Sequence, residues 1–334
     1  MSSKCVIFGG TGFIGSHFAE YLILNGLVDE VYLADIRPIR PFFSFDQNKI
    51  HYVELDVRKP IDAQALPSDV TLVANFAAVH REPGHEDFEY YETNLHGAEN
   101  VCAWAEKVGC KQIVFTSSIA PYGPSELTKD ESSVPVPVSA YGGSKLAAEK
   151  IHLCWQNGDS ENRRLVIVRP GVVFGPGEGG NVSRLVKAVL HRYFIYMGNR
   201  DTRKAGVYVK ELCNAIWWVL QRQGTTGERV ILFNMTMNPG PSIQDYVETV
   251  CKVAGIERWV PSLPYFSLLA TAYVIDAFAK PLGITHPFST VRIKKLVNSN
   301  IIYPGYLVNN SYPYLYTLET AFADWKQSYP EEWS

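Results

Sequence analysis

The chain has 334 residues, of which 46% are hydrophobic and 19% are charged, and its formal net charge is −3. This balance excludes a disordered chain and predicts a globular protein with one large domain or two that share a cleft. Because no run of lysine and arginine stands out, we do not expect a nucleic-acid partner. Six scattered cysteines without a CxxC pair predict reduced, mostly buried thiols of a cytoplasmic protein.

Targeting signals are not expected either. The opening MSSKCVIFGG enters a strand at once and leaves no room for a signal peptide. No apolar run reaches the roughly 18 to 20 residues that cross a bilayer.

The first predicted unit is a strand, a glycine-rich turn and a helix, in KCVIFGGTGFIGSHFAEYLILNG. An apolar run at 6–8 precedes the turn, and apolar residues at helical spacing follow it up to Gly26. Glycines here allow a tight turn and let the backbone approach a pyrophosphate at the helix N-terminus. The residues expected to contact a dinucleotide are Gly9, Gly12, Phe13, Ile14 and Gly15.

A second strand, EVYLAD, ends in Asp35, twenty residues after Gly15. A carboxylate there can accept hydrogen bonds from the adenosine ribose hydroxyls and would repel a 2′-phosphate. NAD is therefore the predicted cofactor, and Arg37 and Arg40 nearby keep NADP as the alternative.

Further strands are predicted in IHYVELDV, VTLVANFAA and QIVFTSS, with a helix from about Asn94 to Lys107 between the last two. Strands that alternate with helices indicate a parallel sheet covered on both faces, the doubly wound Rossmann type of α/β fold. Ligands bind such sheets beyond the carboxyl ends of the strands. The residues expected at those ends are Asp35, Asp56, Ala77 and Ser118.

Tyr141 and Lys145 stand four residues apart in SAYGGSKLAAEK, on the same face of a predicted helix. On spacing alone, an ordinary amphipathic helix is the more common interpretation. A functional interpretation of this pair needs support from motifs elsewhere in the chain.

An apolar segment at 265–280 lies between Pro264 and Pro281. As a helix it would reach only about 24 Å, too short to span a bilayer. It predicts a buried helix of the smaller lobe, and a helix lying on a membrane surface is the alternative. The basic, partly apolar stretch at 287–296 predicts a solvated helix end, or contact with anionic lipid headgroups.

Together these motifs resemble the extended short-chain dehydrogenase/reductase superfamily, in its branch of NAD-dependent sugar epimerases and dehydratases. The stretches that carry the resemblance are GGTGFIG at 9–15, Asp35, DV at 56–57, NFAA at 75–78, Asn94, TSSIAPYG at 116–123, YGGSK at 141–145 and RPGVVFGPG at 169–177.

By this resemblance Tyr141 is the catalytic acid/base, Lys145 is its activating partner and Ser118 is the third member. A phenol of pKa about 10 is a poor base at neutral pH, but a nearby ammonium and the positive nicotinamide favour the phenolate. Lys145 would also hold the nicotinamide ribose, and Ser118 would bond the sugar oxygen. The implied cofactor contacts are the glycine turn, Asp35, Asp56, Val57, Ala77, Ala78, Asn94, Tyr141 and Lys145.

Several reactions fit this set of residues. Relatives that eliminate water across C5 and C6 carry Thr-Asp-Glu where this chain has Ser118-Ile119-Ala120, so we do not expect 4,6-dehydration. Epimerisation at C4 remains, beside a 4-keto-sugar reductase or 3β-hydroxysteroid-type dehydrogenase. Reductases commonly draw on NADPH, so Asp35 favours epimerisation. A dinucleotide-binding sensor or scaffold would typically lack part of the Ser-Tyr-Lys set.

Within the superfamily the chain resembles the 4-epimerases of N-acetylglucosamine linked to polyprenyl diphosphate, which serve bacterial O-antigen and polysaccharide assembly. The shared stretches are FAAVHREP at 76–83, YYETNLHGAENV at 90–101, GGNVSRLVK at 179–187, LPYFSLL at 263–269 and FSTVRIKKL at 288–296. The chain departs at Val79 and Pro83, where that group tends to carry acidic residues. The carrier, uridine or polyprenol, stays open.

A diphosphate-linked sugar needs cations and hydrogen-bond donors in the second lobe. Arginine matches two phosphate oxygens at once, although a solvated surface position is equally common for a single arginine. The candidates for the diphosphate are Asn181, Arg184, Arg203 and Arg292, with His80 and Arg81 near the sugar. No metal is expected, because the eight histidines form no HxH or HExxH motif.

We expect residues 1–170 to form the NAD-binding Rossmann domain, with later pieces near 204–235 where GVYVKEL and RVILFNM add to the sheet. Residues 171–203 and 236–334 would form the substrate-binding lobe, closed by a helix in TLETAFADWKQ. The resemblance implies a homodimer that pairs through helices flanking the sheet, and the expected location is the cytoplasm. Contact with the membrane periphery through 265–280 is a further hypothesis.

Overall fold

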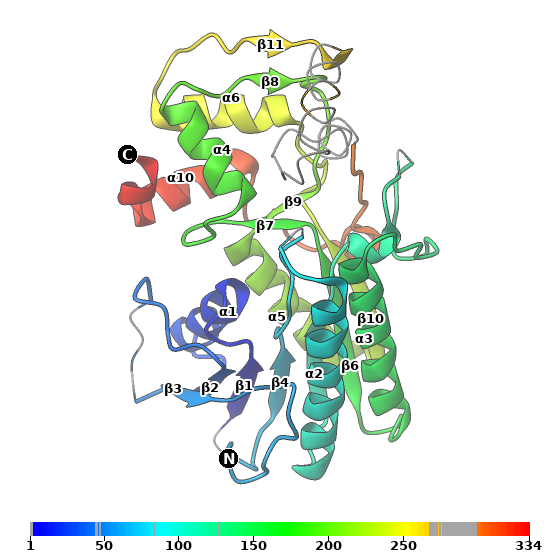
Figure 1. Ribbon diagram of the computed structural model, residues 1–334. Helices are drawn as coiled ribbons and strands as arrows, with labels where there is room; N and C mark the ends of the chain where they lie inside the picture. The colour runs from blue at the N-terminus through cyan, green and yellow to red at the C-terminus, as the bar shows by residue number, and fades with distance from the viewer. Residues whose placement is uncertain are drawn as a thin grey trace.

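The computed structural model describes residues 3–43, 46, 48–82, 84–125, 127–266, 273, 275 and 299–334. Its centre is a seven-stranded parallel sheet in the order β10-β6-β5-β4-β1-β2-β3 (Figure 1). The strands are β1 (Lys4–Phe8), β2 (Glu30–Asp35), β3 (Ile50–Glu54), β4 (Leu72–Asn75), β5 (Gln112–Thr116), β6 (Arg164–Pro170) and β10 (Val230–Met235). Strand order reverses between β1 and β4, which is the switch point where doubly wound sheets bind ligands. The predicted Rossmann-type fold is confirmed.

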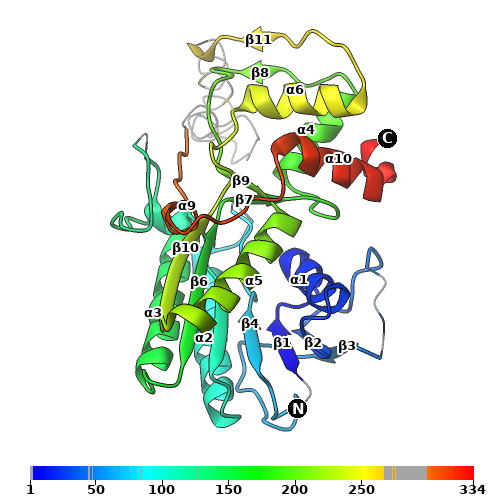
Figure 2. The ribbon, with the colours of Figure 1, turned by 180° about the vertical axis from the view of Figure 1, so that it is seen from behind.

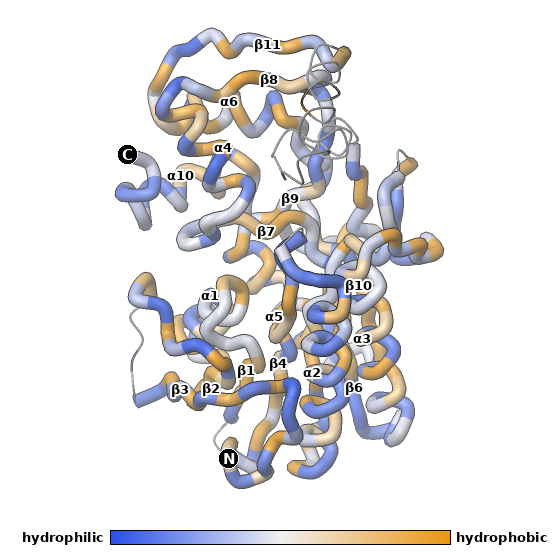
Figure 3. Tube along the Cα trace, in the orientation of Figure 1, coloured by the Kyte–Doolittle hydropathy of each residue, from blue (hydrophilic) through white to orange (hydrophobic). Residues whose placement is uncertain are grey.

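Both faces of the sheet are buried, because successive apolar residues of each strand point to opposite faces. Cys5 and Ile7 of β1 pack toward α1 (Phe13–Leu24) and α5 (Val209–Thr226). Their neighbours Val6 and Phe8 pack toward α2 (Asp87–Lys107) and α3 (Ala140–Asn157). Figures 1 and 2 show the two helix pairs on opposite faces. Figure 3 shows α2 and α3 alternating between hydrophobic and hydrophilic residues, as expected for helices that cover a sheet and face solvent.

A second lobe sits beyond the carboxyl ends of the strands, where β6 runs directly into β7 (Val172–Phe174) (Figure 1). It has its own apolar cluster, centred on aromatic side chains such as Phe174, Phe322 and Trp325. Its remaining elements are α4 (Asn181–Leu190), β8 (Tyr196–Met197), β9 (Gly206–Tyr208), α6 (Ile243–Ala254), β11 (Ser262–Leu263), α10 (Leu318–Ser328) and η3 (Pro330–Trp333). Two short elements lie beside the large sheet instead: η1 (Ala120–Tyr122) contacts α3, and α9 (Gly305–Asn309) contacts β10.

Most predicted elements are found. The helix after the glycine turn and the helix near the C-terminus are confirmed by α1 and α10, and β10 confirms that 229–235 adds to the sheet. The same prediction for 206–212 is wrong: β9 pairs with β7 outside the large sheet, and the chain then enters α5. The helix predicted from Asn94 begins at Asp87 instead, because Glu86 and Glu89 form a capping box there.

Other predictions stay untested. Segment 265–280 falls largely outside the described residues, and 287–296 with Arg292 falls outside them entirely. The division into two domains stays a prediction. In the described part of the chain, no helix is both long and apolar enough to cross a membrane. All six cysteines are free thiols, and four of them are buried.

Candidate functional site

The glycine turn joins β1 to α1 and leaves no space for side chains. Gly9 has φ +73°, and a Cβ there would lie 2.6 Å from the backbone nitrogen of Ala77. A Cβ on Gly15 would collide with the Gly9 carbonyl oxygen. Gly12 is the N-cap of α1, whose first turn holds no acidic residue and, within the described chain, no side-chain cap. The first N–H groups of α1, at Phe13 and Ile14, are thus free of side-chain competition for an anion.

Asp35 ends β2 next to this turn. Its Oδ2 accepts a hydrogen bond from the Thr11 backbone nitrogen at 3.2 Å, and its Oδ1 accepts one from the Arg37 nitrogen at 3.2 Å. The Thr11 hydroxyl donates to the Arg37 carbonyl oxygen at 3.0 Å. These bonds fix the carboxylate beside the turn while its remaining lone pairs can still accept hydroxyl donors.

NAD fits these residues. The open glycine turn leads to the N-terminus of α1, where a diphosphate would lie, and the Asp35 carboxylate stands at the end of the neighbouring strand. Gly9, Gly12, Phe13, Ile14 and Gly15 would hold the diphosphate, and Asp35 the adenosine ribose.

Ser118, Tyr141 and Lys145 meet at the carboxyl edge of the same sheet. Ser118 follows β5, and its Oγ accepts from the Ala120 nitrogen at 3.1 Å. Its side chain lies close enough to that of Tyr141 to lower the Tyr141 pKa by hydrogen bonding. Tyr141 and Lys145 lie in the first two turns of α3. Ser139 is the N-cap of this helix, and its hydroxyl accepts from the Gly142 nitrogen at 3.2 Å. The spacing therefore places both side chains on the face of α3 that meets β5.

Burial dominates the electrostatics of this trio. Lys145 is 2% exposed, and its Nζ lies 4.5 Å from the centre of the Phe115 ring. Burial lowers the pKa of Lys145 to about 7, while the charge of Glu149 acts to raise it. Burial raises the pKa of Tyr141, the Ser118 hydrogen bond lowers it, and the net shift is upward. The residues of the polypeptide therefore raise the pKa of Tyr141, whereas we expected a lowered pKa from the sequence.

A buried ion pair beneath the trio was missed by the sequence reasoning. Arg169 donates from Nε and Nη2 to the Glu149 carboxylate at 2.8 and 2.6 Å, and Ser117 Oγ donates to Glu149 Oε1 at 2.5 Å. Both charged side chains are 3% exposed. A signal existed, because Glu149 stands one turn after Lys145 on α3 and Arg169 begins the RPGVVFGPG stretch. The pair joins α3 to β6 and so fixes the helix that carries Tyr141 and Lys145.

The loop after β4 also reaches this edge. Buried Asn94 accepts from the Val79 nitrogen at 2.9 Å and donates to the Val79 oxygen at 3.2 Å and to Ser144 Oγ at 2.9 Å. Its amide thus ties the loop to α3, and its predicted cofactor contact stays a prediction. Tyr90 of α2, also missed, lies with its ring 6.0 Å from that of Tyr141 and donates to the Arg81 oxygen.

His80 lies in the same loop and is exposed overall. Protein packed around its ring lowers the pKa of His80, and the charges of Lys145, Arg81 and Arg37 lower it further. The charge of Lys145 therefore reaches His80, and the predicted place of His80 beside the sugar stays a prediction.

The other predicted cofactor residues also follow strands at the carboxyl edge of the large sheet. Ala77 and Ala78 follow β4, and the Ala77 backbone touches Gly9. Asp56 follows β3, where Arg58 binds its carboxylate at 2.8 Å and this hydrogen bond lowers the pKa of Asp56. Val57 is buried, and its carbonyl oxygen accepts from the Asn100 side chain at 2.8 Å.

The diphosphate candidates lie apart on the second lobe. Asn181 starts α4, and its Oδ1 accepts from Arg184 Nη2 at 2.6 Å; both side chains are exposed. Arg203 is exposed too, and its Nη1 donates to the Gly240 oxygen at 2.5 Å. Arg292 lies outside the described residues. The structure thus brings Asn181 and Arg184 together but shows no contact between that pair and Arg203.

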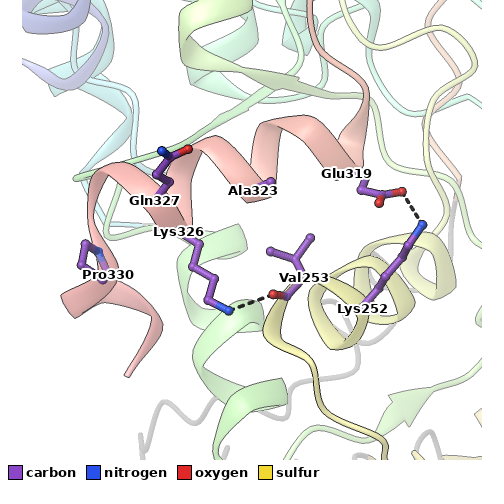
Figure 4. Close-up of a pocket in the computed structure, with 7 residues that line it drawn as sticks. All are labelled: Lys252, Val253, Glu319, Ala323, Lys326, Gln327 and Pro330. Atoms are coloured by element: carbon purple, nitrogen blue, oxygen red, sulfur yellow. Dashed lines mark hydrogen bonds and ion pairs between the residues drawn. The ribbon is translucent and has the colours of Figure 1, made fainter.

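A surface groove of about 590 Å³ between α6 and α10 contains none of these residues (Figure 4). Its walls are joined by Lys252 and Glu319 at 2.6 Å, and by Lys326 with the Val253 oxygen at 2.9 Å. It plays no part in the candidate site. Among the residues described, no cluster of histidine, cysteine, aspartate and glutamate side chains could hold a metal ion.

Comparison with known proteins agrees with this geometry. Residues 5–232 match the model of the NAD dependent epimerase/dehydratase family. The chain is 30% identical to the N-acetyl-alpha-D-glucosaminyl-diphospho-ditrans,octacis-undecaprenol 4-epimerase of Escherichia coli O157:H7, over 88% of this chain and 86% of that protein. It is 26% identical to the decarboxylating sterol-4-alpha-carboxylate 3-dehydrogenase of Candida albicans, over 85% of each. The structure of MoeE5 in complex with UDP-glucose and NAD covers 99% of this chain and 100% of its own, with a TM-score of 0.75 and 19% identity.

The fold and the site define a dinucleotide-binding α/β enzyme with a Ser-Tyr-Lys set. The chain belongs to the NAD-dependent epimerase/dehydratase family. This confirms the predicted family and its cofactor, NAD. The roles given to individual residues stay predictions.

Proposed function

We propose that the protein is a 4-epimerase of N-acetylglucosamine carried on a diphosphate, and that polyprenol is the carrier. The observation that carries the proposal is the meeting of Ser118, Tyr141 and Lys145 at the sheet edge beside the glycine turn. The E. coli relative, whose name gives this reaction on an undecaprenyl carrier, supports the choice of substrate.

The residues divide the work at the sugar. NAD, when bound, would supply the acceptor for the hydride of the sugar C4 and the donor that returns it to the opposite face. Tyr141 would take the proton from the 4-hydroxyl and return it, as a general base and then a general acid. Ser118, whose side chain lies beside that of Tyr141, would hold the same sugar oxygen.

Lys145 supplies the positive charge that this proton transfer needs. Its side chain is enclosed by protein and held over Phe115, so its charge acts in a poorly screened site. The phenolate form of Tyr141, disfavoured by burial, would gain from a cation one turn further along α3. Ile119 and Ala120, next to Ser118, offer neither an acid nor a base, so elimination of water is not supported.

A 3β-hydroxysteroid-type dehydrogenase or a 4-keto-sugar reductase is the alternative enzyme. The 26% identity to the Candida sterol dehydrogenase favours it, because that protein shares most of its length with this chain. The two chemistries differ in the fate of the cofactor, since a dehydrogenase exchanges NAD and an epimerase reuses it. A dinucleotide-binding scaffold without catalysis is the non-enzyme alternative, and the complete Ser-Tyr-Lys set speaks against it.

The carrier diphosphate would lie toward the second lobe. Asn181, Arg184 and Arg203 offer exposed donors there, and an arginine retains free N–H groups after its contacts with Asn181 or Gly240. Arg292 is part of the same proposal. His80 and Arg81 would lie at the sugar.

We propose peripheral contact with the cytoplasmic face of a membrane as part of the same function. Trp259, Phe266 and Tyr273 are 83%, 73% and 57% exposed on the second lobe, next to or within the apolar segment 265–280. A flotation assay with anionic vesicles tests this, using wild type, Trp259→Ala and a double variant with alanine for Lys294 and Lys295. Absence of wild type from the lipid fraction would remove the proposal.

A homodimer through the helices flanking the sheet is a further proposal. A groove of about 340 Å³ on the outer side of α2 and α3 is lined in part by Ala103, Ile151 and Trp155, which suits a helix-to-helix contact. Light scattering on a sizing column should give twice the chain mass, and a monomer at micromolar concentration would contradict it.

The decisive assay for the carrier compares two substrates. The enzyme, with no NAD added, is incubated with UDP-N-acetylglucosamine and with its polyprenyl-diphosphate counterpart, and the epimers are separated. We expect N-acetylgalactosamine on the polyprenyl carrier at the higher rate. Tyr141→Phe should lose activity by roughly 10²-fold or more while keeping NAD. Tyr21→Phe, which removes a hydroxyl bonded to Asn214 away from the trio, is the matched control. Equal activity of Tyr141→Phe and wild type would refute the assignment.

A further inference from the structure

The first part of the loop after β2, at 36–43, is tied to two distant parts of the chain. Arg40 Nη2 donates to the Gly177 carbonyl oxygen at 2.6 Å. The ring of Phe42 stacks on that of Tyr329, with centroids 4.4 Å apart and planes at 17°. The Gly177 nitrogen donates to both carboxylate oxygens of Glu332, each at 3.1 Å. We name these five residues, Arg40, Phe42, Gly177, Tyr329 and Glu332, the clasp.

The clasp closes beside the helix that begins at the glycine turn. Phe43, which is 6% exposed, packs edge-on against His17 of α1, with centroids 4.9 Å apart. His17 Nε2 lies 2.9 Å from the Pro176 oxygen, so α1 also touches the loop that holds Gly177. Phe42 occupies the space beside Gly177, where a Cβ would lie 2.9 Å from its ring. The loop after β2, α1 and the loop after β7 are therefore joined by direct contacts.

The C-terminal side of the clasp is itself anchored. Trp325 Nε1 donates to Glu332 Oε2 at 2.6 Å. Trp333, 7% exposed, packs on Phe322 and Trp325 with centroids 5.6 and 5.9 Å away. Glu332 is thus held by the buried core of the second lobe and can act as a fixed point for Gly177.

We propose that the clasp slows the release of NAD by holding the loop after β2 against the second lobe. The loop starts at Asp35, the expected ribose ligand, whose Oδ1 accepts from the Arg37 nitrogen of the same loop. Opening the loop would displace this carboxylate and uncover the adenosine end of the site. Arg40 and Phe42 are positioning residues, because they act through the loop and not on the dinucleotide.

The inference rests on the proposed function in one respect. An enzyme that reuses one cofactor in every cycle gains from slow release, whereas one that exchanges its cofactor does not. The clasp, which joins the loop after β2 to the second lobe, suits an enzyme that keeps its cofactor.

The test measures release of NAD from loaded full-length protein, without any sugar. Wild type, Arg40→Gln and Phe42→Ala are saturated with NAD and diluted, and the free dinucleotide is followed by desalting at intervals. We expect release roughly tenfold faster in each variant, equivalent to a loss of about 1.4 kcal/mol in the barrier. Phe42→Tyr, which keeps the stacked ring, should release NAD at the wild-type rate.

Arg258→Gln is the matched control. Arg258 also donates to backbone carbonyls, those of Val189 at 2.8 Å and Phe194 at 2.8 Å, but on the second lobe away from the clasp. Its thermal midpoint should fall like that of Arg40→Gln while its release rate stays unchanged. Unchanged release in both clasp variants, or equally fast release in Arg258→Gln, would overturn the proposal. If Phe42→Ala fails to fold, Phe42→Leu replaces it.

The ratio of release rates does not depend on the reaction catalysed. A dehydrogenase with tenfold faster release in the variants would leave the clasp standing and the epimerase proposal refuted. An epimerase whose clasp variants release NAD at the wild-type rate would refute the clasp and leave the epimerase proposal standing.

Discussion

Lys145 is a cation enclosed by the protein, 2% exposed and held above the Phe115 ring. Burial lowers its pKa from 10.5 to about 7, although the charge of Glu149 one turn further on acts against this. Between these two pH values the unfolded chain binds a proton that the folded chain has released. Stability therefore rises with pH across this window, and at pH 7 and below the buried lysine destabilises the fold.

Replacing Lys145 by methionine should separate stability from activity. Methionine has a similar length and no charge, so Lys145→Met should raise the free energy of unfolding at pH 7 by about 2–4 kcal/mol. Epimerase activity should vanish, because the phenolate of Tyr141 loses its cation. Urea unfolding at pH 7 and pH 9.5 measures the first effect, and the gain should shrink at the higher pH. A variant less stable than wild type at both pH values would contradict this account.

Single residues also show how far sequence reasoning reaches. The four-residue spacing of Tyr141 and Lys145 is local, and α3 places both as expected. The Glu149–Arg169 pair is not local, because packing of α3 on β6 brings the two charges together. The direction of the Tyr141 pKa shift depends on burial, which no spacing in the sequence reports.

At the scale of elements, the turn between β1 and α1 carries the strictest demand on sequence. A Cβ at Gly15 would collide with the Gly9 oxygen, so the turn cannot keep its shape with any other residue there. Not every helical glycine is under this demand. Gly224 in α5 has open space, with the nearest atom 3.7 Å from a Cβ.

Two glycine-to-alanine substitutions in helices should therefore act in opposite directions. Gly15→Ala should destabilise the protein by about 1–3 kcal/mol through overpacking and weaken NAD binding. Gly224→Ala should stabilise it by about 0.5–1 kcal/mol, because alanine loses less backbone entropy in a helix. Thermal melts and NAD titrations of both variants check the pair. NAD affinity equal to wild type in Gly15→Ala would remove the turn from the cofactor site.

The types of the elements were predicted better than the strands with which they pair. Glycine punctuation and apolar periodicity mark β1, α1 and β2, because these signals are local. The same signals misplaced 206–208, which is a short apolar strand but pairs with β7 and not with the large sheet. The choice of neighbour depends on where the chain goes after β7, through the second lobe, and a short apolar run does not encode that. The start of α2 was missed because its capping residues are two glutamates and not a serine or threonine.

At the scale of the whole molecule, two buried histidines couple folding to pH. Burial lowers the pKa of His17 and of His152 to about 4. His152 is fixed in its neutral form, since Nδ1 lies 2.8 Å from the Ala148 oxygen and Nε2 lies 3.2 Å from Asn75 Nδ2. In the unfolded chain both would protonate near pH 6.5. Stability is therefore lost as the pH falls from about 6.5 to about 4.

The free energy of unfolding should drop by several kcal/mol over this range, at about 1.4 kcal/mol for each pKa unit of each histidine. Urea titrations at pH 7, 5.5 and 4.5 measure the slope. His152→Gln should make it shallower, whereas His96→Gln, on an exposed position of α2, should leave it unchanged. An identical slope in wild type and His152→Gln would show that His152 does not control the acid response.

The most direct measurement follows a label at the reacting carbon. N-acetylglucosamine on its polyprenyl diphosphate, carrying deuterium at C4, is converted by the enzyme without added NAD, and the product is analysed by mass spectrometry. The account predicts an N-acetylgalactosamine product that keeps the deuterium, because the C4 hydrogen leaves and returns without meeting water. Product that has lost the label, or an oxidised sugar that accumulates with consumption of NAD, would contradict it.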